Sequence, residues 1–272
     1  MLLVTWLKGE QNLNNIEILN YTQNPLTTIG LNSAICYNTE IKDEQHPMRI
    51  AKHCLTHDHG RNFEFADITL KITCSARCAR EWYTHIGGSP TRVQASTRYI
   101  TYDNFNYYTP RGLNKDQRDW YEFAMEILAN IYKELKDTGA KNDLTGYILP
   151  LGMETTFIWK GNARTLENMF NQRLCYRALD EYRFLMKELK AKIANLDEEW
   201  KWISDNFFIP KCIKLGYCPE GKKDCKLYRE KQHVVKKIIK WGERCVFIKV
   251  FIKLFSYYFM GIRFYCYRII VK

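Results

Sequence analysis

Apolar residues recur at three- and four-residue steps between Asn114 and Leu135, and this spacing predicts an amphipathic helix. Its apolar stripe consists of Trp120, Phe123, Ala124, Ile127, Leu128, Ile131 and Leu135. Asn114 and Gln117 have the spacing of an N-cap and its reciprocal partner, so we expect the helix to begin directly after Asn114.

Weaker patterns predict the remaining elements. Further helices are expected over residues 26–37, 48–56 and 75–85, and one long helix from Thr165 to about Leu196. Strands are expected over residues 63–72 and 155–159, with a short strand or turn at 147–150. The strands therefore lie mainly in the first 160 residues, and we predict an α+β fold with a mixed or antiparallel sheet packed against long helices.

Composition is that of a globular protein, with 46% hydrophobic and 26% charged residues in 272. The net charge of +11 favours anionic partners, although much of the excess lies after Lys211 and follows no recognised nucleic-acid module. Ten cysteines in a chain of this length, with no signal-like opening, favour a reducing cytoplasm over a disulfide scaffold.

The clearest chemical candidate is Arg173. At 100° per residue it lies about 20° from Leu166 and about 60° from Phe170, so it shares the apolar side of its helix. A half-buried guanidinium keeps its charge and its five donors, so it needs acceptors. An internal ion pair would satisfy one arginine, whereas Asn162, Arg164, Asn168 and Arg173 together favour a phosphorylated or otherwise anionic ligand.

A second candidate is the segment that ends in Gln94-Ala95-Ser96-Thr97-Arg98-Tyr99. Hydroxyls, backbone N–H groups and the fork of Arg98 can meet on one phosphate, and Tyr99 adds a flat surface. An ordinary loop that enters a strand would have the same composition. Similarly, His57-Asp58-His59 could be a metal pair or a solvated turn.

These separated elements, with Leu149-Pro150 ahead of the Asn162–Arg173 stretch, resemble the flavin-dependent thymidylate synthases from about Ser33 to Cys225. The resemblance implies transfer of a methyl group to dUMP, giving dTMP. It also implies FAD as the cofactor, methylenetetrahydrofolate and NADPH as co-substrates, and a homotetramer with shared active sites. Reduced flavin would carry the one-carbon unit, so no covalent protein nucleophile is needed. Cys74, Cys78 and Cys175 are expected to be small core residues.

The resemblance also implies roles for individual residues. On the nucleotide side are Glu81, where the family usually has glutamine, and the phosphate and sugar residues Gln94, Ser96, Thr97 and Arg98. Arg173 would face the uracil and stabilise the negative charge that develops on it. On the flavin side are His59, Arg61, Glu64, His85, Arg92, Asn162, Arg164 and Asn168.

Two positions depart from the family pattern. Thr84-His85-Ile86 stands where the family has Arg-His-Arg, and Gly146 stands where an arginine is common. We expect Arg92 to restore one charge near the flavin phosphates. These changes also leave open a paralogue that acts on another pyrimidine nucleotide.

The last part of the chain lies outside the resemblance. We predict a catalytic domain over residues 1–230 and a basic, apolar extension over 231–272, in which Lys249, Lys253 and Arg263 interrupt any clean membrane span. The extension could lie on an anionic membrane, or pack as an accessory helix. Cys212, Cys218 and Cys225 lack a tight Cys-x2-Cys pair, so a compact cap is favoured over a zinc site completed by His233. A non-enzymatic, basic nucleic-acid or membrane-binding protein remains the distant alternative.

Overall fold

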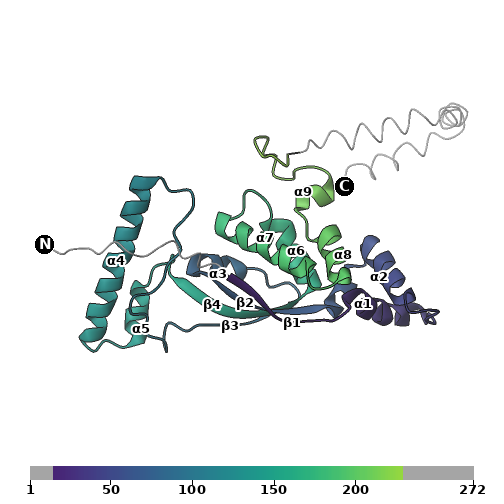
Figure 1. The fold of residues 1–272 in the computed structure, drawn as a ribbon, viewed down its shortest axis with the longest axis horizontal. Helices are drawn as coiled ribbons and strands as arrows, with labels where there is room; N and C mark the ends of the chain where they lie inside the picture. The colour runs from purple at the N-terminus through teal and green to yellow at the C-terminus, as the bar shows by residue number, and fades with distance from the viewer. Residues whose placement is uncertain (1–14, 229–272) are drawn as a thin grey trace, which may run out of the picture. The chain divides into compact units, whose positions relative to one another are not determined.

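A four-stranded antiparallel sheet is the centre of the computed structural model, which describes residues 15–228 (Figure 1). The spatial order is β1-β2-β4-β3. The strands are β1 (Asn15–Tyr21), β2 (Asp67–Ser75), β3 (Thr91–Gln94) and β4 (Glu154–Asn162). The predicted α+β class, with an antiparallel sheet and long helices, is confirmed.

Helices and the loops between them make up the rest of the described chain. The α-helices are α1 (Pro25–Ala34), α2 (His46–Thr56), α3 (Ala76–Trp82), α4 (Lys115–Asp137), α5 (Asn142–Thr145), α6 (Ala163–Arg173), α7 (Asp180–Ala194), α8 (Glu198–Phe207) and α9 (Lys211–Leu215). Three short 3-10 helices are η1 (Ile35–Tyr37), η2 (Gly60–Phe65) and η3 (Gly146–Ile148).

The chain divides into one compact unit that extends to Lys211 and a second that begins at Cys212. The predicted boundary after residue 230, the extension over 231–272 and His233 lie outside the described residues. Between residues 15 and 228, no helix is long and apolar enough to cross a membrane.

The core lies on one face of the sheet. β2 pairs with β4 along its whole length, from Asp67 opposite Asn162 to Ser75 opposite Glu154. Alternate side chains of both strands are buried, as Ile68, Leu70 and Ile72 are in β2. They pack with apolar residues of α1–α3 and α6–α8 in a single cluster. Because β2 and β4 are antiparallel, α3 follows β2 at one end of the pair and α6 follows β4 at the other end, and these two helices carry site residues.

Several predicted elements need correction. The strand expected over 63–72 begins as η2, which turns Phe63 into the core, and extended structure starts only at Asp67. The long helix expected from Thr165 to about Leu196 is wrong, because the chain leaves α6 after Arg173 and re-enters a helix at Asp180. A straight helix of that length would be about 48 Å long. Breaking it lets both segments bury their apolar faces in the same core.

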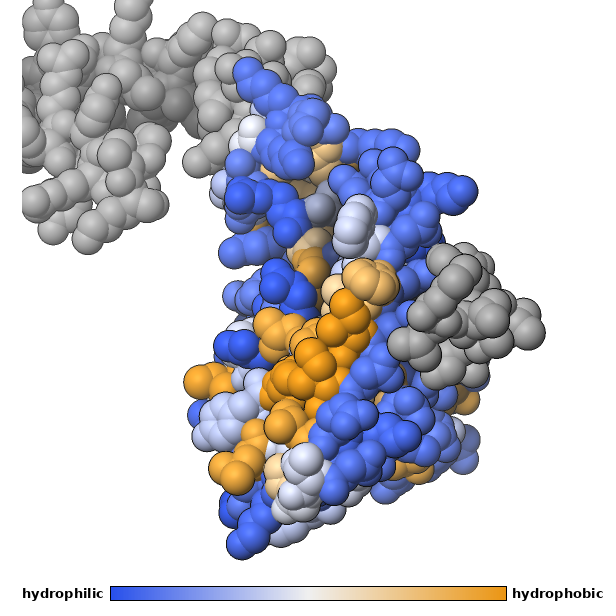
Figure 2. All heavy atoms as spheres, turned by 90° about the vertical axis from the view of Figure 1, so that its left-hand side faces the viewer, coloured by the Kyte–Doolittle hydropathy of each residue, from blue (hydrophilic) through white to orange (hydrophobic). Residues whose placement is uncertain are grey.

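Helix α4 confirms the sequence prediction locally and departs from it in its packing. Its capping box forms as expected, with Asn114 Oδ1 accepting from Gln117 N at 2.9 Å and Asn114 N donating to Gln117 Oε1 at 3.1 Å. Within the chain, however, its buried residues are Met125 and Tyr132. The predicted stripe remains largely in solvent, and Trp120 is 71% exposed. The band of apolar surface in Figure 2 covers the side of the molecule where α4 lies.

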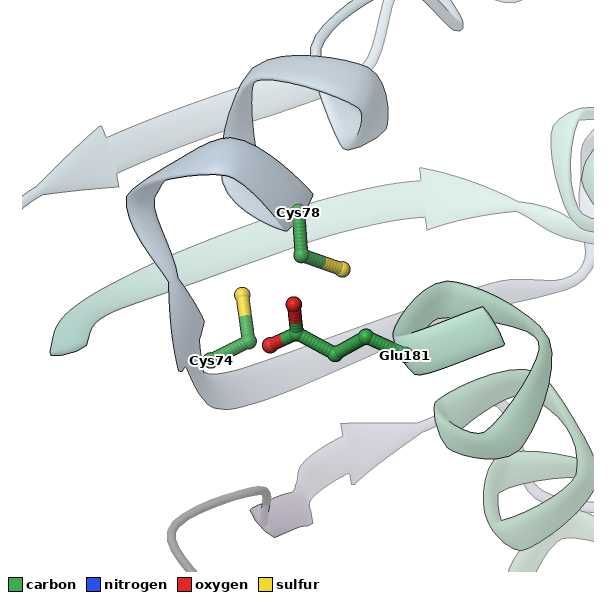
Figure 3. A group of neighbouring side chains, drawn as sticks. All are labelled: Cys74, Cys78 and Glu181. Carbon is green, nitrogen blue, oxygen red and sulfur yellow. The ribbon is translucent and has the colours of Figure 1, made fainter. Parts of the chain in front are cut away.

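A buried polar group fixes the junction between β2 and α3. Glu181, at the start of α7, accepts from the Ser75 backbone N–H at 2.7 Å and from the Ser75 hydroxyl at 2.5 Å. Figure 3 shows its carboxylate pointing between Cys74 and Cys78. The candidate ligand atoms of these three residues lie within 4.8 Å of one another, close enough for a metal ion.

The protonation of this group nevertheless favours hydrogen bonding over metal binding. Burial raises the pKa of Glu181, and its hydrogen bonds to Ser75 only partly oppose that effect. A hydrogen bond with Cys74, followed by burial, raises the pKa of the Cys78 thiol. A metal ligand must be a thiolate, so this environment works against coordination. Cys74 and Cys78 are buried core residues, as predicted, whereas Cys175 is only half-buried.

We expect Ser75→Ala to lower the free energy of unfolding by about 1–3 kcal/mol, because the buried Glu181 loses a hydrogen-bond donor and α3 loses its N-cap. Urea unfolding followed by circular dichroism measures the change. Asn114→Ala is the comparison, because it removes an exposed N-cap worth about 1 kcal/mol. A smaller loss for Ser75→Ala than for Asn114→Ala would contradict a structural role for the Ser75–Glu181 pair.

Candidate active site

Arg173, at the end of α6, is held by three acceptors from the end of α3 and the residues that follow it. Its Nη1 donates to Glu81 Oε2 at 2.7 Å, its Nε to His85 Nε2 at 2.9 Å, and its Nη2 to Thr84 Oγ1 at 3.1 Å. The Arg173 side chain is 18% exposed. The predicted apolar-side placement of Arg173 is therefore correct, and so is its need for acceptors.

An aromatic platform lies against this guanidinium. The ring of Tyr182 is 5.0 Å from the Arg173 guanidinium carbon, and Trp82 stacks on Tyr182 with ring centroids 4.9 Å apart. Tyr182 and Trp82 are fully buried. Tyr182 is not predictable as a neighbour of Arg173, because in one continuous helix it would lie about 13.5 Å along the axis from that residue. The break between α6 and α7 brings the two together.

His85 is a neutral acceptor. Burial, together with the positive charge of Arg173, lowers its pKa to about 4. Because Arg173 Nε–H donates to Nε2, the ring carries its proton on Nδ1. A second proton on Nε2 would place an N–H donor opposite the Arg173 Nε–H. It would also place a positive charge beside the guanidinium.

The first turn of α6 carries a second set of predicted residues. Asn162 ends β4 and caps the helix, accepting from Thr165 N at 3.0 Å. Arg164 and Asn168 are exposed four residues apart, so they share a face of the helix. Arg164 Nη1 pairs with Glu64 Oε1 of η2 at 2.9 Å. Arg164 and Arg173 thus contact different elements from the two ends of one helix.

The turn before η2 lies next to Arg164. A Cβ built on Gly60 would be 4.0 Å from Arg164 Nε, which places the His59–Gly60 turn beside that side chain. His59 and Arg61 are exposed. His59 also lines a cavity of about 430 Å³, together with residues of α1 and α2 that include Arg49 and His53.

The loop after α3 contacts both ends of α6. After His85 the chain passes Gly87, whose carbonyl accepts from Thr165 Oγ1 at 2.7 Å. Gly88 has a φ of +79°, and a Cβ there would lie 2.3 Å from Thr165 Oγ1. Only glycine allows this approach. The loop from Thr84 to Gly88 therefore contacts α6 at both its last and its first turn.

Gln94 and Arg92 lie on the edge strand β3, and both contact Tyr83. Gln94 Oε1 accepts from the Tyr83 hydroxyl at 2.8 Å, and Gln94 Nε2 donates to Thr155 Oγ1 at 3.0 Å. Arg92 stacks on the Tyr83 ring at 4.3 Å and donates to its carbonyl. Since Tyr83 directly precedes Thr84, both side chains lie beside the segment that holds Arg173.

The following bend carries Ser96, Thr97 and Arg98. Ser96 Oγ accepts from Arg98 N at 3.2 Å. Arg98 Nε pairs with Asp143 of α5 at 2.9 Å, and the Arg98 side chain is 67% exposed. Gly146 packs against this bend, because a Cβ there would lie 3.3 Å from the Thr97 carbonyl oxygen. Within the described chain, this bend therefore contacts α5 and η3 rather than the Arg173 group.

The chain belongs to the family described as thymidylate synthase complementing protein, whose model matches residues 17–197. A flavin-dependent thymidylate synthase from Pyrococcus furiosus is 32% identical over 220 residues, which is 75% of this chain and 89% of the relative. The Clostridium tetani enzyme of the same name is 27% identical over 248 residues, covering 80% of this chain and 96% of the relative.

The fold has a solved counterpart. The crystal structure of Thymidylate Synthase X (ThyX) from Helicobacter pylori with FAD and dUMP superposes with a TM-score of 0.58. It covers 72% of this chain and 99% of that chain at 19% sequence identity. The likeness establishes a shared fold for most of the chain.

The lowered pKa of His85 predicts a pH dependence of stability. The unfolded ring binds a proton near its ordinary pKa of 6.5, and the folded ring only near 4. The contribution of His85 is therefore complete above pH 6.5 and is lost as pH falls toward 4. Urea midpoints between pH 7 and pH 4.5 should fall less steeply in His85→Leu than in the wild type. Equal slopes would contradict the prediction.

Proposed function

We propose that this protein methylates dUMP to dTMP, with FAD as its cofactor, methylenetetrahydrofolate as the carbon donor and NADPH as the reductant. The family match over residues 17–197 carries the proposal, because it spans α3, β3, β4 and all of α6. The relatives' names support the activity, and the neighbour with FAD and dUMP supports the ligands. A purely non-enzymatic basic protein has no comparable support.

Residues at the start of α6 are suited to hold the flavin. Arg164 and Glu64 form an ion pair whose side chains are 45% and 36% exposed. Such a surface pair is weak, so a phosphate can displace the carboxylate and take the Arg164 fork. Asn168 adds an exposed amide on the same face, and His59 and Arg61 flank the neighbouring turn. When bound, the flavin supplies the hydride and one-carbon transfer chemistry.

Three further residues belong to the flavin set expected from the sequence, and one of them, Asn162, caps α6 by accepting from Thr165 N. Arg92 is engaged by Tyr83, so it must leave that ring to meet a flavin phosphate. His85 differs from the rest of the flavin set, because its Nε2 already accepts from Arg173.

Arg173 is suited to the pyrimidine. It presents a fixed positive charge with little access to water, and a preorganised donor of this kind is worth ~3–4 kcal/mol in the transition state. Gln94, near Tyr83, and the Ser96–Arg98 bend supply the amide, hydroxyl and guanidinium groups for the sugar and phosphate. Arg98 would release Asp143 to bind the nucleotide phosphate, as Arg164 would release Glu64 to bind a flavin phosphate.

We further propose that the active unit is a homotetramer with shared sites. The exposed stripe of α4 supports association, because Trp120, Phe123, Ile127 and Ile131 occupy one helical face in solvent. Sharing would also give the Ser96–Arg98 bend a nucleotide-side partner from another subunit.

The activity is tested with purified protein. We expect flavin absorbance and formation of dTMP from dUMP, and a loss of turnover of roughly 100-fold or more in Arg173→Ala. Arg183→Ala, which removes an arginine that is 18% exposed, like Arg173, and is paired with Asp180 on α7, is the matched control and should retain turnover. A colourless preparation after reconstitution with FAD would refute the proposal. A different methylated pyrimidine would identify a paralogue, as the changes at Gly146 and Thr84–Ile86 allow.

A substitution that adds a charge to the α4 stripe tests the proposed homotetramer. Ile127→Asp places a carboxylate in the α4 stripe and should convert the oligomer to smaller species, measured by light scattering after gel filtration. Because Ile127 is 40% exposed, the fold itself should tolerate the change. Glu134→Asp, on the same helix and exposed, is the control. An unchanged mass in Ile127→Asp would remove α4 from the interface.

A further inference from the structure

We propose that Thr84 and His85 are positioning residues of the nucleotide site, which hold the Arg173 guanidinium in one orientation for the pyrimidine. This inference rests on the proposed function. It gives the altered triplet a role different from flavin binding, because two of its three side chains are used as acceptors for Arg173.

The hydrogen bonds of Arg173 leave two of its N–H groups for a ligand. The guanidinium has five N–H groups, and within the described chain three of them meet Glu81, Thr84 and His85. One N–H on each terminal nitrogen is left. Contacts to all three nitrogens fix both the plane of the fork and its rotation, so these two N–H groups point in a set direction.

The charges of the three acceptors differ. Thr84 is neutral, and so is His85 because its pKa is lowered to about 4. These two residues orient the cation without cancelling its charge. Glu81 does cancel it, but the Glu81 side chain is 32% exposed, so it is the partner that can yield to a ligand. The nucleotide would then meet a guanidinium that is still held at Nε and Nη2.

The surrounding structure keeps these acceptors in place. His85 is only 8% exposed and meets the buried Tyr182 edge-on, with ring centroids 6.2 Å apart. Its backbone N–H donates to the Trp82 carbonyl at 3.3 Å. Beyond it, the Gly87 carbonyl is tied to Thr165 at the start of α6. The loop is thus anchored on both sides of the contact.

The test compares substitutions that keep or remove the acceptor. In holoprotein, flavin content is measured by visible absorbance and dUMP affinity by calorimetry. His85→Leu and Thr84→Val should weaken dUMP binding roughly 10-fold with flavin content retained. His85→Gln and Thr84→Ser, which keep an acceptor, should restore most of it. Thr138→Val, at the exposed end of α4, is the control for the loss of a hydroxyl and should have no effect.

A double-mutant cycle separates positioning from an independent contact. In an Arg173→Ala background, His85→Leu should weaken dUMP binding no further, because its effect acts through the guanidinium. Full additivity would overturn the inference. Loss of flavin with unchanged dUMP affinity of the flavin-loaded fraction would also overturn it, and would return His85 to the cofactor side.

An NMR titration tests the contact without any ligand. The ring of His85 should titrate near pH 4 in the wild type and at a higher pH in Arg173→Ala, because one of the two causes of its lowered pKa is removed. Identical titration in both proteins would refute the contact. Failure of the wild type to bind flavin and dUMP would refute the proposed function, whereas normal wild-type binding with an unaffected His85→Leu variant would refute this inference alone.

Discussion

The guanidinium of Arg173 imposes the constraint on which the site depends. It cannot lose its charge and is mostly removed from water, so its donors must meet acceptors or a ligand. The chain meets this requirement with Glu81, Thr84 and His85 on one side and the Tyr182 ring on another. The end of α3, the loop after it and the start of α7 are all arranged around one side chain.

Helix α6 places the proposed flavin residues at its start and the proposed pyrimidine residue at its end. It begins where β4 ends, because Asn162 is both the last strand residue and the N-cap. Arg164 faces η2 in the first turn, and Arg173 faces α3 at the end. The Gly87–Gly88 turn packs on the first turn of the helix, and Thr84 and His85 bind its last residue. A shift in this loop would therefore affect both ends of the helix.

Helix α4 shows the limit of periodicity as a guide to packing. Its apolar spacing and capping pair are local properties, and both produced the expected helix. The same spacing does not say what covers the stripe. Met125 packs in the small cluster with Phe105 and Met153, and the buried Tyr132 hydroxyl accepts from Tyr102 N, while Trp120 and Phe123 remain in solvent. An amphipathic helix can serve the core of its own chain or the surface of another.

The sequence by itself determined the α+β class, the capped helix after Asn114 and the apolar side on which Arg173 lies, because these depend on neighbours within one or two turns. It did not reveal β1, whose only fully buried residue is Ile16, nor the break after Arg173. The partners of Arg173 lie 88–92 positions away in the chain, and Tyr182 reaches it only through that break. Only tertiary packing decides such contacts, because helix periodicity carries no information about which distant segment fills the space beside a side chain.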